Sequence, residues 1–271
     1  MVWWSGTVGR RLARYLTQPG RATETVTTND PDALAATLRP GDVLLVEGVS
    51  RVAAAIKYLT QSTWSHSALY IGEVLGRPPA GAKPLVLIEA DLTAGVRAVP
   101  LSQYAERHTR ICRPVGLSEA DVRRVIDYAI SQLGYQYDLH NLIDLARYLL
   151  STPPVPVRWR RRLIALGSGA PTRAICSSLI AQAFSAVGYP ILPIMTRESR
   201  SDAAGAYRVR EILHIRHHSL YTPRDFDISP YFRIVKPTIE AGFDYRSLVW
   251  ADEHPDPPQP DAEAARARQG S

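Results

Sequence analysis

The chain has few cysteines: only Cys112 and Cys176 occur among its 271 residues. This scarcity argues against a framework of disulfides and against a four-cysteine zinc site. The composition is compatible with one disulfide between these two cysteines, although a reducing compartment, in which both are free thiols, is the simpler interpretation. Because 45% of the residues are hydrophobic, the chain is still long and apolar enough to bury a sizeable core.

Long apolar runs are also absent. No stretch reaches the roughly 18–20 apolar residues that span a bilayer. Arg10 and Arg11 interrupt the first segment before an apolar core of signal-peptide length can form. We therefore expect a cytoplasmic protein, either free or peripheral on the inner membrane.

Acidic residues are missing from two segments, although the net charge of the whole chain is only +6. Residues 145–197 contain no Asp or Glu, and neither do residues 1–23. The first of these segments holds a dense basic cluster, namely Arg158, Arg160, Arg161 and Arg162. Such a segment is either a solvated face or a contact for an anionic partner, such as lipid headgroups or an acidic substrate. No nucleic-acid motif accompanies the arginines, so we expect no nucleic-acid partner.

The pattern of apolar residues predicts an α+β protein. Glycine- or proline-bounded apolar runs predict strands near residues 41–48, 65–72, 84–90, 95–99 and 109–115. Helical spacing predicts helices over residues 50–61, 118–133 and 138–150, and from about residue 177. Residues 1–37 form a basic amphipathic segment with Trp3 and Trp4, followed by a linker, and residues 251–271 have the composition of a disordered tail.

Two residues carry the chemistry that this pattern suggests. Cys176 stands at the start of the last predicted helix, where the positive end of the backbone dipole favours a thiolate. His66 lies in the predicted strand Trp64-Ser-His-Ser-Ala-Leu-Tyr-Ile-Gly. A thiol needs a base or an imidazolium beside it to react well at neutral pH. The chain therefore offers both halves of a cysteine nucleophile site.

Glu89 is the candidate for a third member. If the strands on either side of residues 73–82 form a hairpin with Gly72 near Lys83, then His66 pairs directly with Glu89. Opposed residues of an antiparallel pair share a face and can form a hydrogen bond. A carboxylate there would orient the imidazole and stabilise its charged form. The alternative is a carboxylate at a strand end that faces solvent.

These motifs together resemble a known family. Residues 39–45, the stretch around His66, Ile88-Glu89-Ala, Gly134-Tyr-Gln-Tyr-Asp138 and Ile175-Cys176-Ser-Ser are similar to the circularly permuted NlpC/P60 papain-like enzymes. This YiiX/YaeF-like type is related to lecithin:retinol acyltransferase, and its histidine precedes its cysteine in the chain. The resemblance covers about residues 38–190.

The resemblance implies a permuted papain-like domain over residues 38–250, with a small antiparallel β-barrel or sheet packed against helices. It implies that Cys176 is the nucleophile, His66 the general base and Glu89 the residue that orients it. The backbone N–H of Cys176 and the Tyr137 hydroxyl are the expected oxyanion donors, with Tyr135 and Ser65 as further substrate-binding candidates. Either tyrosine can equally be a packed residue of a turn.

No cofactor or metal is expected. His214, His217 and His218 place at most two imidazoles on one face, and no acid or cysteine nearby completes a metal site. Cys112 lies in a predicted strand and is interpreted as an inert core thiol. Asp138 is better explained as a helix cap than as a substrate contact.

We therefore expect a cysteine hydrolase or acyltransferase that forms a thioester. The basic segments favour an acyl-lipid substrate at an anionic membrane. A peptidoglycan peptide is the alternative substrate. The rival of another class is a module that binds lipid or peptide without turnover.

Overall fold

The computed structural model of the chain describes residue 18 and residues 30–76, 78–91, 94–136, 175–201 and 207–247. Residues 1–17 and 19–29 of the expected N-terminal segment, the helix expected at residues 138–150, the tail, and the cluster Arg158, Arg160, Arg161 and Arg162 lie outside these residues. The chain divides into two units, Met1–Ala241 and Gly242–Ser271, and the described part of the second holds the short helix η3 (Tyr245–Ser247). Within the described ranges, no helix has the length and apolarity needed to cross a membrane.

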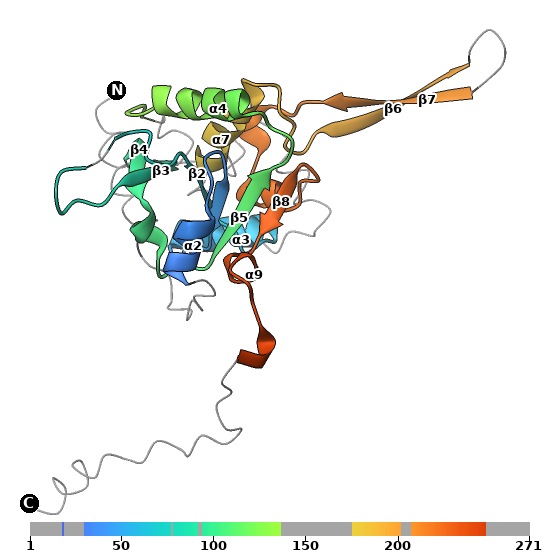
Figure 1. Cartoon of the computed structure of the whole chain (residues 1–271). Helices are drawn as coiled ribbons and strands as arrows, with labels where there is room; N and C mark the ends of the chain where they lie inside the picture. The colour runs from blue at the N-terminus through green and yellow to red at the C-terminus, as the bar shows by residue number, and fades with distance from the viewer. Residues whose placement is uncertain are drawn as a thin grey trace, which may run out of the picture. The chain divides into compact units, whose positions relative to one another are not determined.

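A six-stranded antiparallel sheet forms the centre of the first unit (Figure 1). Its order in space is β4 (Gly95–Pro100), β3 (Leu85–Asp91), β2 (His66–Tyr70), β1 (Val43–Val46), β5 (Thr109–Pro114) and β8 (Phe232–Val235). The described strands form an open sheet with β4 and β8 at its edges. The predicted α+β class, with an antiparallel sheet packed against helices, is confirmed.

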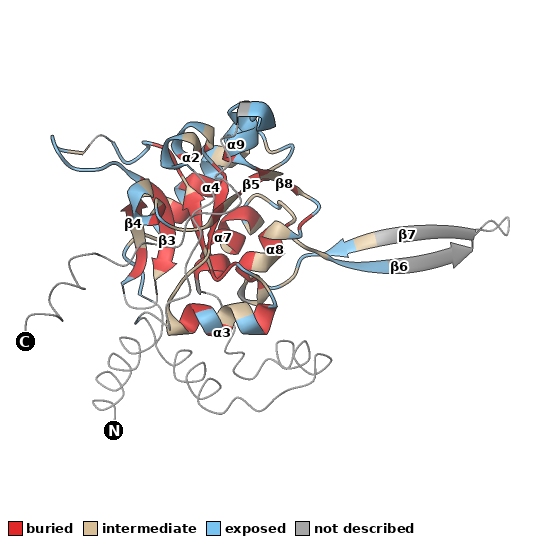
Figure 2. Cartoon of the chain, turned by 90° about the horizontal axis from the view of Figure 1, so that it is seen from below, coloured by how far each residue is buried: buried red, intermediate tan, exposed pale blue. Residues whose placement is uncertain are grey.

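Apolar side chains cover both faces of this sheet. All four residues of β1 are buried: Val43 and Leu45 join one apolar cluster, and Leu44 and Val46 join another. A strand buried on both faces has the continuous apolar sequence seen here. Helices α4 (Glu119–Ser131) and α7 (Ile175–Ser185) contribute to the first cluster, whereas α2 (Pro31–Thr37) and η1 (Leu101–Tyr104) contribute to the second. Figure 2 shows α7 as one of the buried elements beside the strands.

Helix boundaries follow local capping. The Ser50 side chain accepts a hydrogen bond from the Ala53 N–H and starts α3 (Arg51–Thr60), which ends at Gln61 in the left-handed conformation. Ser118 caps α4 in the same way through the Asp121 N–H. Because side-chain oxygens at these positions satisfy free N–H groups, the starts of both helices could be predicted within a residue.

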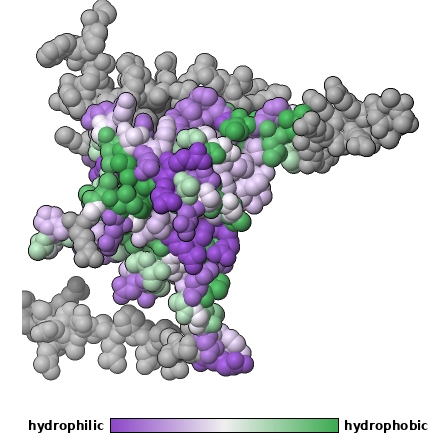
Figure 3. Space-filling view, turned by 45° about the horizontal axis from the view of Figure 1, so that its top comes forward, coloured by the Kyte–Doolittle hydropathy of each residue, from purple (hydrophilic) through white to green (hydrophobic). Residues whose placement is uncertain are grey.

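A second, two-stranded sheet consists of β6 (Ile194–Ser201) and β7 (Tyr207–His214) (Figure 1). The sequence pattern did not predict this hairpin. Apolar surface gathers where it joins the body (Figure 3), and the exposed residues there are Ile194, Met195, Leu213 and Ile215. The short helices η2 (His218–Leu220), α8 (Pro223–Asp227) and α9 (Pro237–Glu240) follow.

The predicted register between β2 and β3 is wrong by two residues. Glu89 pairs with Ala68, and the Ile71 N–H donates to the Val86 carbonyl at 2.8 Å, so the strands are aligned differently from the expected pairing of His66 with Glu89. Pro84 has no N–H to give to the ladder, and β3 begins only at Leu85. A shift of two residues keeps every side chain on its face of the sheet. His66 and Glu89 are therefore diagonal neighbours on one face.

Candidate active site

Cys176 lies in the first turn of α7, which packs against β2 and β3. The thiol is 5% exposed and its Sγ is 3.9 Å from the Ser177 hydroxyl. Burial alone would raise the pKa of the Cys176 thiol. The charge and hydrogen bond of His66, together with donors from Ser67, outweigh burial and lower this pKa below its usual value. The first backbone N–H groups of the helix add a positive dipole at the same place.

His66 is the first residue of β2, and its imidazole has two partners. Its Nε2 lies 2.8 Å from Oε2 of Glu89. The interaction with Cys176 is thereby left to the other ring nitrogen. Burial would lower the pKa of His66, but the charges and hydrogen bonds of Cys176 and Glu89 raise it to about 10. The pair is therefore arranged to exist as thiolate and imidazolium.

Glu89 is buried in the middle of β3, with 1% of its side chain exposed. Burial would raise the pKa of this carboxyl, yet hydrogen bonds and charges from His66, Tyr104 and Arg97 hold it at about 2. The carboxylate is thus ionised wherever the histidine can be charged. Cys176, His66 and Glu89 form one connected chain of thiol, imidazole and carboxylate.

Four residues beside this chain were not predicted from the sequence. Ser67 is fully buried and its hydroxyl lies 3.3 Å from that of Ser177, beside the thiol. Arg97, Gln103 and Tyr104 all donate to the Glu89 carboxylate. Of these four, only Arg97 could have been found by strand pairing, because it lies directly opposite Glu89 in β4. Gln103 and Tyr104 belong to a 3-10 turn, whose sequence lacks the alternation of apolar and polar residues that shows which way a strand residue faces.

A family model for permuted papain-like amidase enzymes, described as YaeF/YiiX, the C92 family, matches residues 37–148. The matched segment contains the histidine and the carboxylate of the site and ends before Cys176. Over these residues the chain is similar to the permuted papain-like YaeF/YiiX family. The resemblance predicted from the sequence is confirmed over these residues, and the matched family is one of papain-like hydrolases of the amidase type.

One solved structure is similar to this chain at low identity. It is the crystal structure of metalloprotein yiiX from Escherichia coli O157:H7, with 15% identity and a TM-score of 0.42. The match covers 73% of this chain and 96% of that one.

The structure describes only part of the predicted substrate-binding set. Tyr137 lies outside the described residues. Tyr135 has an exposed side chain, and its backbone carbonyl accepts the Val96 N–H at 2.9 Å. The Ser65 hydroxyl accepts the Gly48 N–H at 2.9 Å and is 4% exposed as a residue. Ser65 therefore has a structural contact of its own at the approach to β2.

Neither the histidine-rich segment nor Cys112 joins the site. His214 bonds to the Thr196 hydroxyl at 2.7 Å, whereas the His218 Nδ1 lies 2.9 Å from the Gln182 amide. No group of three or more His, Cys, Asp or Glu side chains within the described ranges is placed to hold a metal ion. Cys112 is a free thiol, fully buried in β5, and burial strongly raises its pKa.

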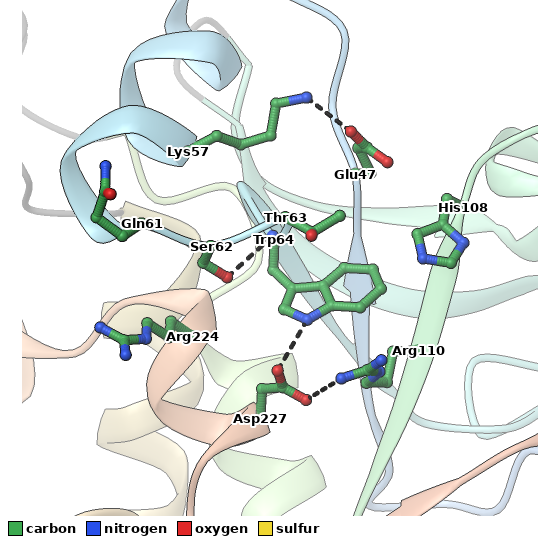
Figure 4. Close-up of a pocket in the computed structure, with 10 residues that line it drawn as sticks. All are labelled: Glu47, Lys57, Gln61, Ser62, Thr63, Trp64, His108, Arg110, Arg224 and Asp227. Carbon is green, nitrogen blue, oxygen red and sulfur yellow. Dashed lines mark hydrogen bonds and ion pairs between the residues drawn. The ribbon is translucent and has the colours of Figure 1, made fainter. Parts of the chain in front are cut away.

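A polar pocket of about 550 Å³ opens at one end of the sheet (Figure 4). The Trp64 indole is stacked on the His108 ring, with the two centroids 5.0 Å apart, and donates to Asp227 at 3.1 Å. Arg110 completes this wall with an ion pair to Asp227 at 2.6 Å. The opposite wall carries the Lys57–Glu47 ion pair at 2.8 Å. Ion pairs thus build much of the pocket's lining.

The pocket lies at the end of the sheet where His66 begins β2. Val46, the last residue of β1, pairs with both His66 and Thr109. The pocket-lining residues Glu47 and His108 adjoin these paired positions in the chain. The pocket and the start of β2 therefore lie at the same end of the sheet.

Proposed function

We propose that this chain is a cysteine amidase with Cys176 as nucleophile, His66 as acid and base, and Glu89 as the residue that orients the imidazole. The connected thiol, imidazole and carboxylate carry this proposal. The lowered pKa of the thiol and the raised pKa of His66 are the shifts such a pair needs. The amidase description of the matched family supports the choice of bond.

The first half of the reaction forms an acyl-enzyme. The Cys176 thiolate attacks the carbonyl carbon of the amide and forms a C–S bond. The imidazolium of His66 then gives its proton to the leaving nitrogen as the C–N bond breaks. An amine departs, and the acyl group stays on Cys176 as a thioester.

The second half returns the enzyme to its starting state. Neutral His66 takes a proton from water while the water oxygen attacks the thioester carbon. The C–S bond breaks, the carboxylic acid leaves, and the thiolate–imidazolium pair is restored. Throughout both halves Glu89 accepts the Nε2 hydrogen bond and prevents the ring from turning away.

Stabilisation of the oxyanion is assigned to the start of α7. The N–H of Cys176 is in the first turn of the helix, where backbone donors have no partner in the preceding turn. We propose this N–H as one oxyanion donor and the Tyr137 hydroxyl as the second. Tyr135 and Ser65 stay weaker candidates for contact with the substrate.

The lining of the pocket bears on the substrate class. We propose that the substrate extends from Cys176 into this pocket. Its ion pairs, amide and hydroxyl groups suit a peptide-like amide better than an acyl chain, because an apolar chain would exclude water from these polar groups without replacing its hydrogen bonds. We therefore propose a peptide-like amide substrate, for which a peptidoglycan peptide has the required chemistry.

The proposal is tested by following products. The wild type and Cys176→Ala are incubated separately with a bacterial muropeptide extract and a bacterial lipid extract, and the products are identified by mass spectrometry. We expect muropeptides to be split with the gain of one water by the wild type alone. If neither extract is changed while the protein still retains a component of one, the chain is a binding module.

Acyl lipids at an anionic membrane are the second candidate. The exposed apolar residues at the base of the β6–β7 hairpin favour it, together with the acid-free basic segment of residues 145–197. Arginines attract anionic headgroups while apolar side chains insert between them. Under this candidate the protein is cytoplasmic and peripheral on the membrane, and the same experiment would show cleaved or transferred acyl groups in the lipid extract.

A further inference from the structure

Glu89 is held by more donors than its role beside His66 requires. Its Oε1 accepts from Arg97 Nε at 2.9 Å and Nη2 at 2.8 Å, and from Gln103 Nε2 at 3.3 Å. Its Oε2 accepts from His66 Nε2 at 2.8 Å and from the Tyr104 hydroxyl. These donors come from three separate elements, β4, η1 and β2. These donors therefore hold the carboxylate in one orientation and also keep it ionised.

Arg97 supplies the charge that a buried carboxylate needs. It stands directly opposite Glu89 in the β3–β4 pairing and makes two contacts to one oxygen. Its Nη2 also lies 3.8 Å from Asp91, so the guanidinium is shared by two carboxylates of β3. A buried carboxylate without such a partner would take up a proton and lose its effect on the imidazole.

Tyr104 orients the Glu89 carboxylate towards His66. Its hydroxyl donates to the same oxygen that faces His66, and its ring lies 6.0 Å from the imidazole, tilted by 43°. Burial and the neighbouring Glu89 raise the pKa of Tyr104, so the hydroxyl keeps its proton and donates it to Glu89, while it accepts from Gln103 Nε2 at 3.2 Å. With 8% of its surface exposed, the residue also packs in the second apolar cluster, which holds its ring in place.

We propose that Arg97 and Tyr104 are positioning residues, which keep Glu89 ionised and aimed at Nε2 of His66 so that the thiolate–imidazolium pair persists in acid. This inference rests on the proposed function of Cys176 and His66. The charged or titratable groups around Glu89 are His66 from β2, Arg97 from β4, Tyr104 from η1 and Asp91 from its own strand. Cys176 acts on Glu89 only through His66.

The sign of the pH effect follows from Glu89. A carboxylate with a depressed pKa keeps its charge above that pKa and loses it as the pH falls through it. Removal of a donor raises the pKa of Glu89, so its charge is lost at a higher pH. Below that pH the imidazolium has lost its partner, and the thiolate beside it is less stable. The acid limb of the Cys176 profile, which is the pH range over which its reactivity is lost as the pH falls, therefore moves to higher pH.

The test is pulsed alkylation of the folded protein with iodoacetamide between pH 2 and pH 9, with Cys176 quantified by mass spectrometry. The variants are Tyr104→Phe, Arg97→Gln and Arg97→Lys. Tyr189→Phe is the matched control, because it also removes a hydroxyl that bonds to carbonyl groups, at Val115 and Tyr231. We expect the acid limb to rise by about one pH unit in Tyr104→Phe, the size of one hydrogen bond to a charged group. A larger rise is expected in Arg97→Gln.

Partial return towards the wild-type limb in Arg97→Lys supports a role through charge. Acid limbs of Tyr104→Phe and Arg97→Gln that coincide with those of the wild type and Tyr189→Phe would overturn the proposal, whatever happens to thermal stability. This failure differs from failure of the proposed function, in which Cys176 of the wild type itself would react like an ordinary thiol.

Discussion

The Nε2 of His66 lies 2.8 Å from Oε2 of Glu89, although the two residues are diagonal rather than opposed in the sheet. Diagonal neighbours on one face are within reach when both side chains are long. The contact therefore depends on the pleat of β2 and β3 and on the shared face. Donors from β4 and η1 then fix the carboxylate in place.

We expect the two cysteines to react very differently with iodoacetamide. Cys176 should be alkylated well below the unperturbed thiol pKa of about 8.5, because His66 lowers its pKa. Cys112 should be protected, because it is fully buried and its pKa is raised. The measurement is the alkylation rate of each cysteine against pH in the native protein. Equal and slow labelling of both would contradict the assignment.

Substitutions in the site should separate the three roles. Cys176→Ala and His66→Ala should each abolish amide turnover. Glu89→Gln should retain part of the activity, because glutamine keeps the shape of the side chain but loses the charge that stabilises the imidazolium. A hydrogen bond to a charged group contributes about 1.5–3 kcal/mol, so kcat/KM should fall roughly tenfold to a hundredfold. Wild-type activity in Glu89→Gln would mean that another residue orients His66.

Gly95 should be intolerant of a side chain. Its φ is +73°, and a Cβ there would lie 2.3 Å from the Tyr135 carbonyl oxygen, part of the backbone. Gly95→Ala should lower the free energy of unfolding by about 1–3 kcal/mol from strain, plus the cost of moving the carbonyl. Gly81→Ala is the matched control, since Gly81 has a φ of +87° and nothing within 4 Å of a Cβ. Urea unfolding of both variants checks this, and equal losses would show that the contact with Tyr135 is unimportant.

The basic segments should give salt-sensitive binding to anionic vesicles if lipids are the substrate. Each basic residue near an anionic surface contributes about 1 kcal/mol, which salt screens within about 10 Å. Co-sedimentation with phosphatidylglycerol and phosphatidylcholine vesicles, at low and high salt, measures this. Binding should weaken when four arginines are changed together to glutamine, namely Arg158, Arg160, Arg161 and Arg162. The charge-matched control changes four exposed arginines elsewhere, namely Arg123, Arg124, Arg233 and Arg246.

Equal binding to both lipids, or to neither, would return the arginines to the interpretation of a solvated face. It would also remove the main support for an acyl-lipid substrate. Loss of binding in the control set as well would show that only total charge matters.

Local sequence patterns predicted most of the sheet and the helix starts. Strands β1 to β5 follow apolar runs bounded by glycine or proline, and Ser50 and Ser118 mark the starts of α3 and α4 through their side-chain caps. The hairpin β6–β7 and strand β8 were missed. Their stability depends on pairing between segments, which composition does not reveal.

The core of the site could be predicted because its chemistry is encoded in residue types. The cysteine stands at a helix start, and the histidine and glutamate stand on adjacent strands. To place the last two together, the prediction had only to put them on the same face of the sheet, and the two-residue error in register left that face unchanged. Tyr104, Gln103 and Ser67 could not be predicted, because their roles depend on the path of a turn and on the packing of α7 against β2.

The most direct test of the central claim is a search for an acyl group on Cys176 itself. The wild type is mixed with muropeptide extract, quenched in acid within its turnover time and digested, and the peptide that contains Cys176 is weighed by mass spectrometry. We predict an added acyl mass on this peptide that neutral hydroxylamine removes, as expected of a thioester. Consumption of the same substrate by Cys176→Ala at the wild-type rate, with no added mass on Cys176 in the wild type, would contradict the account.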